Sequence, residues 1–487
     1  MGPGIVTLVD LYAILPEIAL VILAALIMVL DLFRPKRRYD NLLGWVTFIG
    51  ISLIAILGIV LFWPGNESFL VWGGMLRVDS AAAIFRLIIL MGAALAVLFS
   101  MHIDSVNQRG EYFAMLLFSI IGMGLMAAAS DLIMLYLAIE ITAIPLYVLA
   151  GFITREKKSA ESGLKYLLFG AMTSAVMLYG FSLLYGFSGS TQFSSILAAL
   201  QEGLIPPGIQ AMILFLVVVG FGFKVSAVPF HFWAPDVYEG SPTPVSGFLS
   251  TSSKAAGFIA LMRFLLSVFV IEPQIWMLIV AMLATISMLT GNLLAMVQKD
   301  AKRLLAFSSI SHAGYILIGV ASGTALGMKG VIYYLLAYLF TNTAAFGVIN
   351  AIERETGSSE LNQLNGLMKR SPGLALILLV SFLSLAGIPP FGGFISKIIV
   401  FSAAVEANMV WLLLVGILNS IIGLYYYLTV LRIAFTGDAE VSKPVTVFPA
   451  WKFAFAICVL GIIVLGVIYS PWMNWIGQAS TNLLIVH

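Results

Sequence analysis

Four ionisable residues lie inside long apolar runs, where they could carry protons. They are Glu140 in LMLYLAIEITAIPLY, Lys224 in VVVGFGFKVSAVPF, Lys254 in STSSKAAGFIALM and Lys397 in PPFGGFISKIIVF. A charge within a membrane costs about 2.5–3.5 kcal/mol, so it persists when it is paired or when it reaches water. The four residues are therefore candidates for a proton relay. Structural ion pairs between helices, with one lysine reaching the membrane surface, are the alternative interpretation, and it has most weight for Lys254.

Lysine suits a relay because its affinity for a proton depends on its surroundings. Removing an ammonium group from water lowers its pKa from about 10.4, and a nearby carboxylate opposes that change. A lysine whose glutamate partner can approach and withdraw is thus a switchable proton site. We predict that Glu140 modulates Lys224, and that Lys254 and Lys397 receive the proton in turn.

Two of these lysines lie beside predicted interruptions of a helix. Pro229 removes a backbone hydrogen bond five residues after Lys224. The second predicted break precedes Lys397 and consists of Pro389, Pro390, Gly392 and Gly393. Broken helices expose carbonyl and amide groups that can hold water within the membrane. An ordinary kink, common in membrane helices, is the alternative.

Four further residues are candidates for an accessory proton path. His231 follows Lys224 by seven residues, roughly on one helical face if the helix resumes, and its ordinary pKa near 6.5 suits proton transfer. A hydrogen-bonded core histidine explains His231 equally well. Lys165 could supply protons from the cytoplasmic side or could only fix orientation. Lys302 and His312 are weaker candidates.

The composition predicts a membrane protein. Of the 487 residues, 61% are hydrophobic and only 10% are charged, whereas soluble domains carry about 25% charged residues. Lipid is the solvent that suits this chain. The net charge of +2 indicates no nucleic-acid partner. A single cysteine, Cys458, and four scattered histidines argue against a disulfide, an iron–sulfur cluster, zinc, haem or copper. We find no dinucleotide or phosphate-binding motif, so no cofactor or metal is predicted in this chain.

Apolar stretches long enough to cross a membrane predict an all-α protein with about fourteen transmembrane helices. The stretches are 11–33, 42–63, 78–101, 113–130, 131–153, 164–187, 209–232, 243–270, 274–297, 303–321, 328–352, 372–403, 409–432 and 450–470. Asp79, Asp104, Asp131 and Glu272 lie near the ends of these stretches and are expected to be solvated.

Basic residues predict the orientation. Arg34, Lys36, Arg37 and Arg38 follow the first span, and alternation of the spans places most of the 25 Lys and Arg residues at the same side. That side is cytoplasmic by the positive-inside rule. Both termini then face outward, which in a cell inner membrane is the periplasmic side.

A short similarity between two segments of the chain predicts two inverted repeats. Residues 227–230 (AVPF), in the seventh span, resemble residues 387–391 (GIPPF), in the twelfth, and the two spans run in opposite directions. Such paired breaks are typical of inverted-repeat transporters. The predicted organisation is three N-terminal helices at 1–112, a first repeat at 113–270, a second repeat at 271–435 and a C-terminal helix at 436–487.

Two longer motifs resemble those of a known family. Residues 229–245 (PFHFWAPDVYEGSPTPV) and 384–397 (SLAGIPPFGGFISK) are similar to signatures of the antiporter-like membrane subunits of respiratory complex I, the type I NADH:quinone oxidoreductase. The span count and order are similar over nearly the whole chain. The resemblance implies a translocase subunit that moves protons while other subunits bind NADH, FMN, iron–sulfur clusters and quinone. It also implies lipid and the complex I membrane subunits M and K as neighbours.

The resemblance assigns roles to matching positions. Glu140, Lys224, Lys254 and Lys397 take the places of the family's proton-translocating residues, and Lys165 and His231 those of accessory ones. Rival interpretations are a subunit of an Mrp-type sodium/proton antiporter and a membrane subunit of a ferredoxin-, F420- or hydrogenase-linked complex. A membrane enzyme acting on lipids would need clustered acidic or metal-binding residues, which we do not find. A structural scaffold that transports nothing is a further alternative, and it would tolerate neutralisation of all four buried charges.

Overall fold

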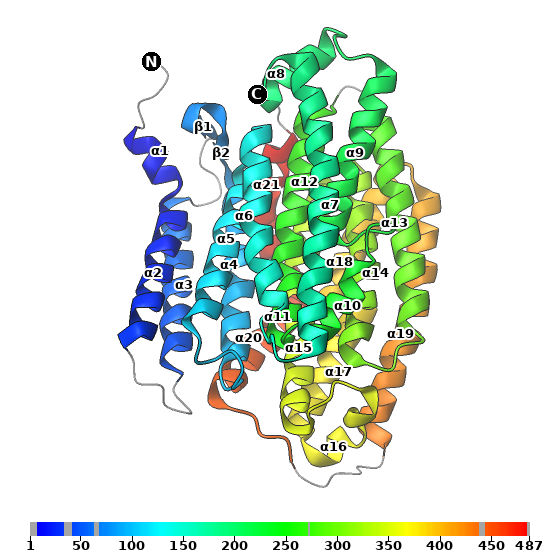
Figure 1. The fold of residues 1–487 in the computed structure, drawn as a ribbon. Coiled ribbons are helices and arrows are strands. Elements are labelled where there is room, and N and C mark those ends of the chain that lie inside the picture. The colour runs from blue at the N-terminus through cyan, green and yellow to red at the C-terminus, as the bar shows by residue number, and fades with distance from the viewer. Residues whose placement is uncertain (1–6, 34–40, 63–67, 271–272, 438–443, 485–487) are drawn as a thin grey trace.

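The computed structural model describes residues 7–33, 41–62, 68–270, 273–437 and 444–484 (Figure 1). The basic residues Arg34, Lys36, Arg37 and Arg38, used above to predict orientation, lie outside the described residues, as does Glu272. The described residues form a bundle of helices with one short β-hairpin. This confirms the predicted all-α membrane fold.

The N-terminal part contains two peripheral helices and the hairpin. Its elements are α1 (Leu8–Ala13), α2 (Leu15–Phe33), α3 (Leu42–Leu61), β1 (Phe69–Val71), the 3-10 turn η1 (Trp72–Gly74), β2 (Leu76–Val78), α4 (Ser80–Ser100) and α5 (Gly110–Ala128). The strands pair antiparallel, with Phe69 opposite Val78. Asp79 caps α4 by accepting a 2.8 Å hydrogen bond from Ala82 N, which satisfies a free amide at the helix start.

The middle of the chain contains the first interrupted helix. Its elements are α6 (Leu132–Ala150), α7 (Lys157–Ser188), α8 (Phe193–Gln201), α9 (Pro207–Val225), α10 (Trp233–Gly240), α11 (Thr243–Phe248), the π-helical turn η2 (Leu249–Ser253) and α12 (Lys254–Val268). The π turn runs directly into α12, so Lys254 lies where the helical geometry changes. Such turns are frequent at functional sites.

The C-terminal part contains the second interruption. Its elements are α13 (Pro273–Ala295), α14 (Ala301–Ala321), α15 (Ala325–Thr356), η3 (Leu361–Leu364), α16 (Leu367–Arg370), α17 (Pro372–Ala386), α18 (Gly392–Glu406), α19 (Val410–Thr436), α20 (Pro449–Val467) and α21 (Tyr469–Leu484). The sequence pattern did not predict α21, which packs against α4 and α15.

Twelve described helices are long and apolar enough to cross a membrane. Two expected spans contain no such helix. The eighth is divided into α11, η2 and α12, and the twelfth is divided into α17 and α18. The count of fourteen is therefore not established. The helices α14 and α15 form the centre, because 100% and 94% of their most apolar windows are buried, against 33% for α2 and 28% for α3.

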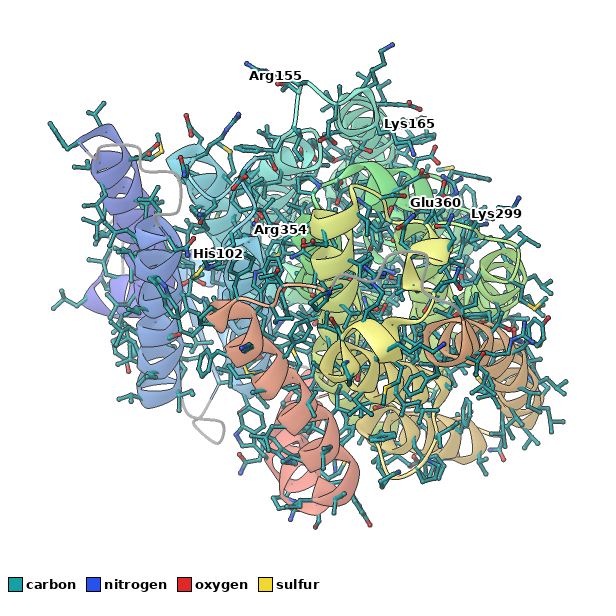
Figure 2. All side chains as sticks on the ribbon, turned by 90° about the horizontal axis from the view of Figure 1, so that it is seen from below. His102, Arg155, Lys165, Lys299, Arg354 and Glu360 are labelled. Carbon is teal, nitrogen blue, oxygen red and sulfur yellow. The ribbon has the colours of Figure 1, made fainter. Side chains whose placement is uncertain are left out.

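The two ends of the bundle differ. The helix α1 and the C-terminal end of α21 lie at one end, and α16 lies at the other (Figure 1). Figure 2 views the α16 end and shows Arg155, Lys165, Lys299 and Arg354 there. Basic residues thus gather at the end opposite α1.

Candidate proton pathway

The two helix interruptions have the same backbone pattern. After α9, Ser226 adopts a left-handed conformation with φ 60°, and after α17, Gly387 does so with φ 83°. The next residues, Ala227 and Ile388, each donate to the carbonyl five residues earlier, at 2.8 and 3.0 Å. Both breaks also contain a cis proline peptide bond, at Pro229 and at Pro390. The resemblance seen in the sequence is thus a resemblance in structure.

The second break is shorter than the sequence suggested. Gly392 and Gly393 were expected within it, but they form the first turn of α18. The interruption therefore covers residues 387–391, with Pro389 and Pro390 at its centre. Gly393 is required for close packing, because a Cβ atom there would lie 1.9 Å from Ser384 O on α17.

The backbone groups freed by the two breaks find different partners. At the first break, Trp233 Nε1 donates to Phe223 O at 3.1 Å, and Val228 N donates to Ser287 Oγ at 2.9 Å. At the second, Lys397 Nζ itself donates to Ala386 O at 3.0 Å. One lysine is therefore bound to its break, and the other is not.

Lys224 is buried without a hydrogen-bond partner. Its side chain is in a residue only 4% exposed, and within the described chain Nζ has no acceptor. Glu140, on α6, is partly buried and accepts a hydrogen bond from Ser174 Oγ on α7. Glu140 interacts electrostatically with Lys224, but no hydrogen bond joins the two among the described side chains. The pair is therefore close enough to communicate without being locked together.

Lys254 is buried and held by one residue. Its Nζ donates to the carbonyl and the hydroxyl of Ser309 on α14, at 2.8 and 2.5 Å. Gly257, one turn further along α12, lies against Lys224, because a Cβ atom there would be 3.3 Å from Lys224 Cβ. The helix α12 thus begins with Lys254 and contacts Lys224.

His312 lies between Lys254 and Lys397. It interacts electrostatically with both lysines. Its Nδ1 and Nε2 are 2.7 and 3.1 Å from the hydroxyl groups of Tyr334 and Tyr427. Since both ring nitrogens have phenol partners, His312 can accept a proton at one nitrogen and release one at the other.

Lys397 ends the row of buried charges. It is 6% exposed, and its Nζ lies 4.6 Å from the ring centroid of Tyr315. It also lines a cavity of about 280 Å³ together with Gly387 and Ser420. We call Glu140, Lys224, Lys254, His312 and Lys397 the polar axis.

The accessory candidates lie in different places. His231 is 5% exposed within the first break rather than on a continuous face with Lys224, because α9 has already ended. Lys165 makes ion pairs of 2.6 Å with Glu161 and 2.5 Å with Asp236 at the α16 end. Lys302 is 4% exposed and pairs with Glu353 at 2.8 Å. Of these three, none contacts a polar-axis side chain by hydrogen bond among the described residues.

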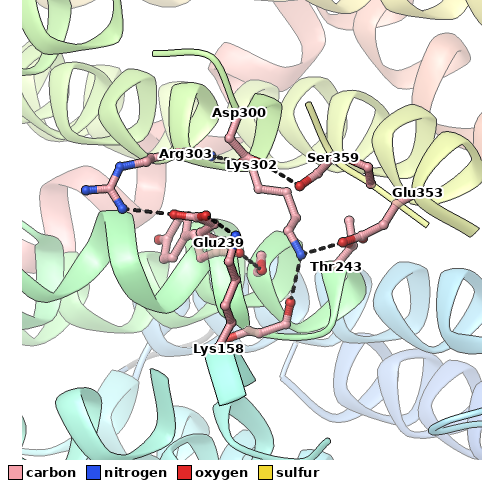
Figure 3. A network of polar contacts seen from close by, with 12 residues as sticks. Lys158, Glu239, Thr243, Asp300, Lys302, Arg303, Glu353 and Ser359 are labelled. Atoms are coloured by element: carbon pink, nitrogen blue, oxygen red, sulfur yellow. Dashed lines mark hydrogen bonds and ion pairs between the residues drawn. The ribbon is translucent and has the colours of Figure 1, made fainter. Parts of the chain in front are cut away.

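The sequence analysis missed an ionic cluster on α10. Arg303, on α14, contacts Asp236 at 2.6 Å. It also contacts Glu239 at 2.9 Å, and Lys158 lies 2.8 Å from the same glutamate (Figure 3). Burial alone would raise the pKa of both carboxyl groups, but hydrogen bonds from the basic partners hold each pKa below its ordinary value. The cluster stabilises α10, the second half of the broken helix, against α7 and α14.

Two expectations about acidic residues are wrong. Asp79 and Asp131 were expected to be solvated, but they are 5% and 1% exposed. Asp79 forms a bidentate pair with Arg263 at 2.5 and 2.9 Å, and Asp131 caps α6 through the amides of Ile133 and Met134. A position near a span end is not a solvated position where neighbouring helices cover it. Within the described ranges, no group of three or more His, Cys, Asp or Glu side chains could hold a metal ion.

Comparison with known proteins places this arrangement in a class. The family described as "NADH:quinone oxidoreductase/Mrp antiporter, TM" matches residues 129–423, which include both breaks and the whole polar axis. A chain of respiratory complex I from Thermus thermophilus aligns with a TM-score of 0.80 and 32% identity, covering 94% of this chain and 98% of that one. A chain of the Mrp complex from Dietzia sp. has a TM-score of 0.86 at 22% identity, covering 98% of both chains, and shows a common fold alone. The protein is therefore an antiporter-like membrane protein.

Curated relatives narrow the class. The NADH-quinone oxidoreductase subunit N of Desulfitobacterium hafniense is 38% identical, covering 96% of this chain and 98% of the relative. The subunit N of Dehalococcoides mccartyi is 39% identical, covering 97% of this chain and 99% of the relative. The chain belongs to the NADH-quinone oxidoreductase subunit N family, and the resemblance found in the sequence is confirmed.

Proposed function

We propose that this chain is a proton-translocating, multi-pass membrane subunit of an NADH:quinone oxidoreductase. The observation that carries the proposal is the polar axis: three buried lysines and a histidine follow one glutamate through the centre of a membrane bundle. Membership of the subunit N family supports the same function. The ferredoxin-, F420- and hydrogenase-linked alternatives have no comparable support among the relatives named above.

The proposed relay begins at the Glu140–Lys224 pair. Because Lys224 has no hydrogen-bond partner among the described residues, its proton affinity responds to any movement of Glu140, which Ser174 holds. A proton released by Lys224 passes along α12 to Lys254. His312 then transfers it between the Lys254 and Lys397 ends of the axis, through Tyr334 or Tyr427.

The energy required is of a size that one such pair can supply. Moving one elementary charge across a membrane costs about 2.3 kcal/mol per 100 mV. A change of one pKa unit corresponds to about 1.36 kcal/mol. A change of about 1.7 units at a single lysine therefore matches the work of moving one charge across 100 mV.

The other parts of the proposal follow from the family. The chain acts as part of a translocase and carries no redox centre of its own, while other subunits hold NADH, FMN, iron–sulfur clusters and quinone. Membrane subunits M and K are the proposed neighbours. The basic α16 end is proposed to be cytoplasmic by the positive-inside rule, with both termini periplasmic. The proposed repeats, 113–270 and 271–435, each contain one break.

The relay is tested by neutralising its first pair. Glu140→Gln and Lys224→Ala variants are made in the intact complex, and NADH-driven proton uptake is measured in inverted membrane vesicles. We expect pumping to slow at least tenfold, which corresponds to about 1.4 kcal/mol in the barrier. Glu202→Gln and Lys157→Ala change the same residue types at exposed positions and should pump normally. Normal pumping by both relay variants in a fully assembled complex would refute the proposed function.

A further inference from the structure

The α16 end contains a polar cavity that the relay does not use. It has a volume of about 610 Å³ and opens between the α4–α5 and α6–α7 connections, the α10–α11 turn and the segment after α15. Six acidic residues line it, Asp104, Glu156, Glu239, Asp300, Glu353 and Glu360, against three basic ones. The excess of carboxylates in a concave site attracts cations. The lining of the cavity is therefore acidic, whereas the α16 end that surrounds it is basic.

One ion pair lies in the wall of this cavity. Lys302 Nζ donates to Glu353 Oε1 at 2.8 Å and to Ser241 O at 3.2 Å, and the other Glu353 oxygen accepts from the Thr243 hydroxyl (Figure 3). The Lys302 side chain is 5% exposed and that of Glu353 is 29% exposed. Both side chains line the cavity, and the lysine is the more deeply buried of the two.

Behind this pair, the same face of α14 leads to the polar axis. Lys302 and Ser309 are seven residues apart, two helical turns, which corresponds to about 10.5 Å along the axis of the helix. Ser309 holds Lys254. The buried hydroxyl of Tyr238 interacts with Ser309, but among the described residues it makes no hydrogen bond of normal geometry. Buried polar atoms are normally satisfied by protein groups or by ordered water, so this hydroxyl marks a place for water on the route.

We propose that this cavity is the vestibule through which protons enter the polar axis, and that the Lys302–Glu353 pair in its wall is the gate. The inference rests on the proposed function and adds the uptake site for its ion. A hydronium ion in the vestibule gives its proton to the Glu353 carboxylate and leaves as water. The neutral acid no longer compensates Lys302, so the pair separates. Once Lys254 has passed its own proton on to His312, the proton of Glu353 moves by water and Tyr238 to the free amine of Lys254, and Glu353 recovers its charge.

The gate is tested by removing the charge of Glu353. Glu353→Gln keeps the size of the side chain and can still accept from Thr243, but it cannot take up a proton. Glu355→Gln is the matched control, because Glu355 is exposed on the same helix and does not line the cavity. In the intact complex, we expect NADH-driven proton uptake to fall at least tenfold in Glu353→Gln and to be unchanged in Glu355→Gln. Equal pumping by the two variants overturns the gate.

The Lys224→Ala variant separates this inference from the function on which it rests. If Lys224→Ala stops pumping while Glu353→Gln pumps normally, the relay stands and the gate is wrong. If Glu140→Gln and Lys224→Ala both pump normally, the proposed function itself fails.

A second measurement tests the vestibule even if Glu353→Gln does not assemble. Cys458 is the sole cysteine of this chain and is buried. In a Cys458→Ser background, the chain therefore has no cysteine of its own that a thiol reagent could label. Ser358→Cys lies at the rim, and Ser241→Cys lies beside the gate. A small, membrane-impermeant cationic thiosulfonate should modify both cysteines from the same side of the membrane. Modification of Ser358→Cys alone, in an active complex, overturns the vestibule.

Discussion

A substitution of Gly393 tests the close packing of α17 and α18 at the second break. Gly393→Ala would place a Cβ atom 1.9 Å from Ser384 O, whereas real Cβ atoms essentially never come closer than 3.0 Å to another group. The start of α18 must therefore move away from α17 by about 1.1 Å, the difference between these two distances. The obstacle is a backbone carbonyl in a helix, so it cannot turn aside as a flexible side chain can.

The displacement should affect both stability and transport. Overpacking of this kind costs about 1–3 kcal/mol. Lys397 lies one turn beyond Gly393 on the same helix, and its 3.0 Å hydrogen bond to Ala386 O joins α18 to the end of α17. A shift of the size given above stretches this bond beyond hydrogen-bonding range. Lys397 should then lose the acceptor that positions it, and proton transfer at this end of the polar axis should slow.

The control is Gly373→Ala, in the first turn of α17, where a new Cβ atom meets nothing within 4 Å. Both variants are compared as purified complexes by thermal denaturation and, in vesicles, by NADH-driven proton uptake. We expect Gly393→Ala to denature earlier and to pump more slowly than Gly373→Ala. Indistinguishable behaviour of the two variants would show that the close approach of α17 and α18 does not position Lys397.

Two further predictions concern charges outside the relay. Arg263→Met leaves the Asp79 carboxylate buried without its bidentate partner and should destabilise the protein by about 3–5 kcal/mol, measured by thermal denaturation. Adding Asp79→Asn to this variant should recover part of the lost stability. A double variant that is no more stable than Arg263→Met alone would contradict this prediction. Burial lowers the pKa of His102, and Arg354 lowers it further. Since the folded state resists protonation, His102 should stabilise this corner fully above its ordinary pKa of about 6.5 and lose that contribution as the pH falls. Hydrogen exchange of residues 101–109 should therefore accelerate from about pH 7.5 to 5.5, after correction for intrinsic rates, and His102→Gln should remove the dependence.

The sequence predicted the features that depend on local chemistry. Lysines in apolar runs and prolines beside them are visible without a fold, and the structure indeed places Lys224 and Lys397 beside the two breaks. The membrane fold also follows from composition. The position of the second break was less accurate, because glycine at residues 392 and 393 serves the packing of α18 rather than its interruption.

Contacts between distant parts of the chain could not be predicted in this way. Glu353 lies 51 residues from Lys302, and its role at the cavity depends on how α15 passes α14. Asp79 and Arg263 are separated by 184 residues, so nothing near Asp79 in the sequence indicates its partner. Whether a carboxylate near the end of a span is solvated is decided by the helices that cover it.

The contact between α20 and the α4–α5 turn has a consequence for biogenesis. Trp451 Nε1 donates at 2.9 Å to Met101 O, a carbonyl 350 residues earlier in the chain. At a translation rate of about 5–20 residues per second, the ribosome needs roughly 20–70 s to make the intervening segment. Throughout that time the early helices are in the membrane without the tryptophan that completes them. The insertion machinery must therefore protect the incomplete surface of the bundle until the last helices have been synthesised and inserted.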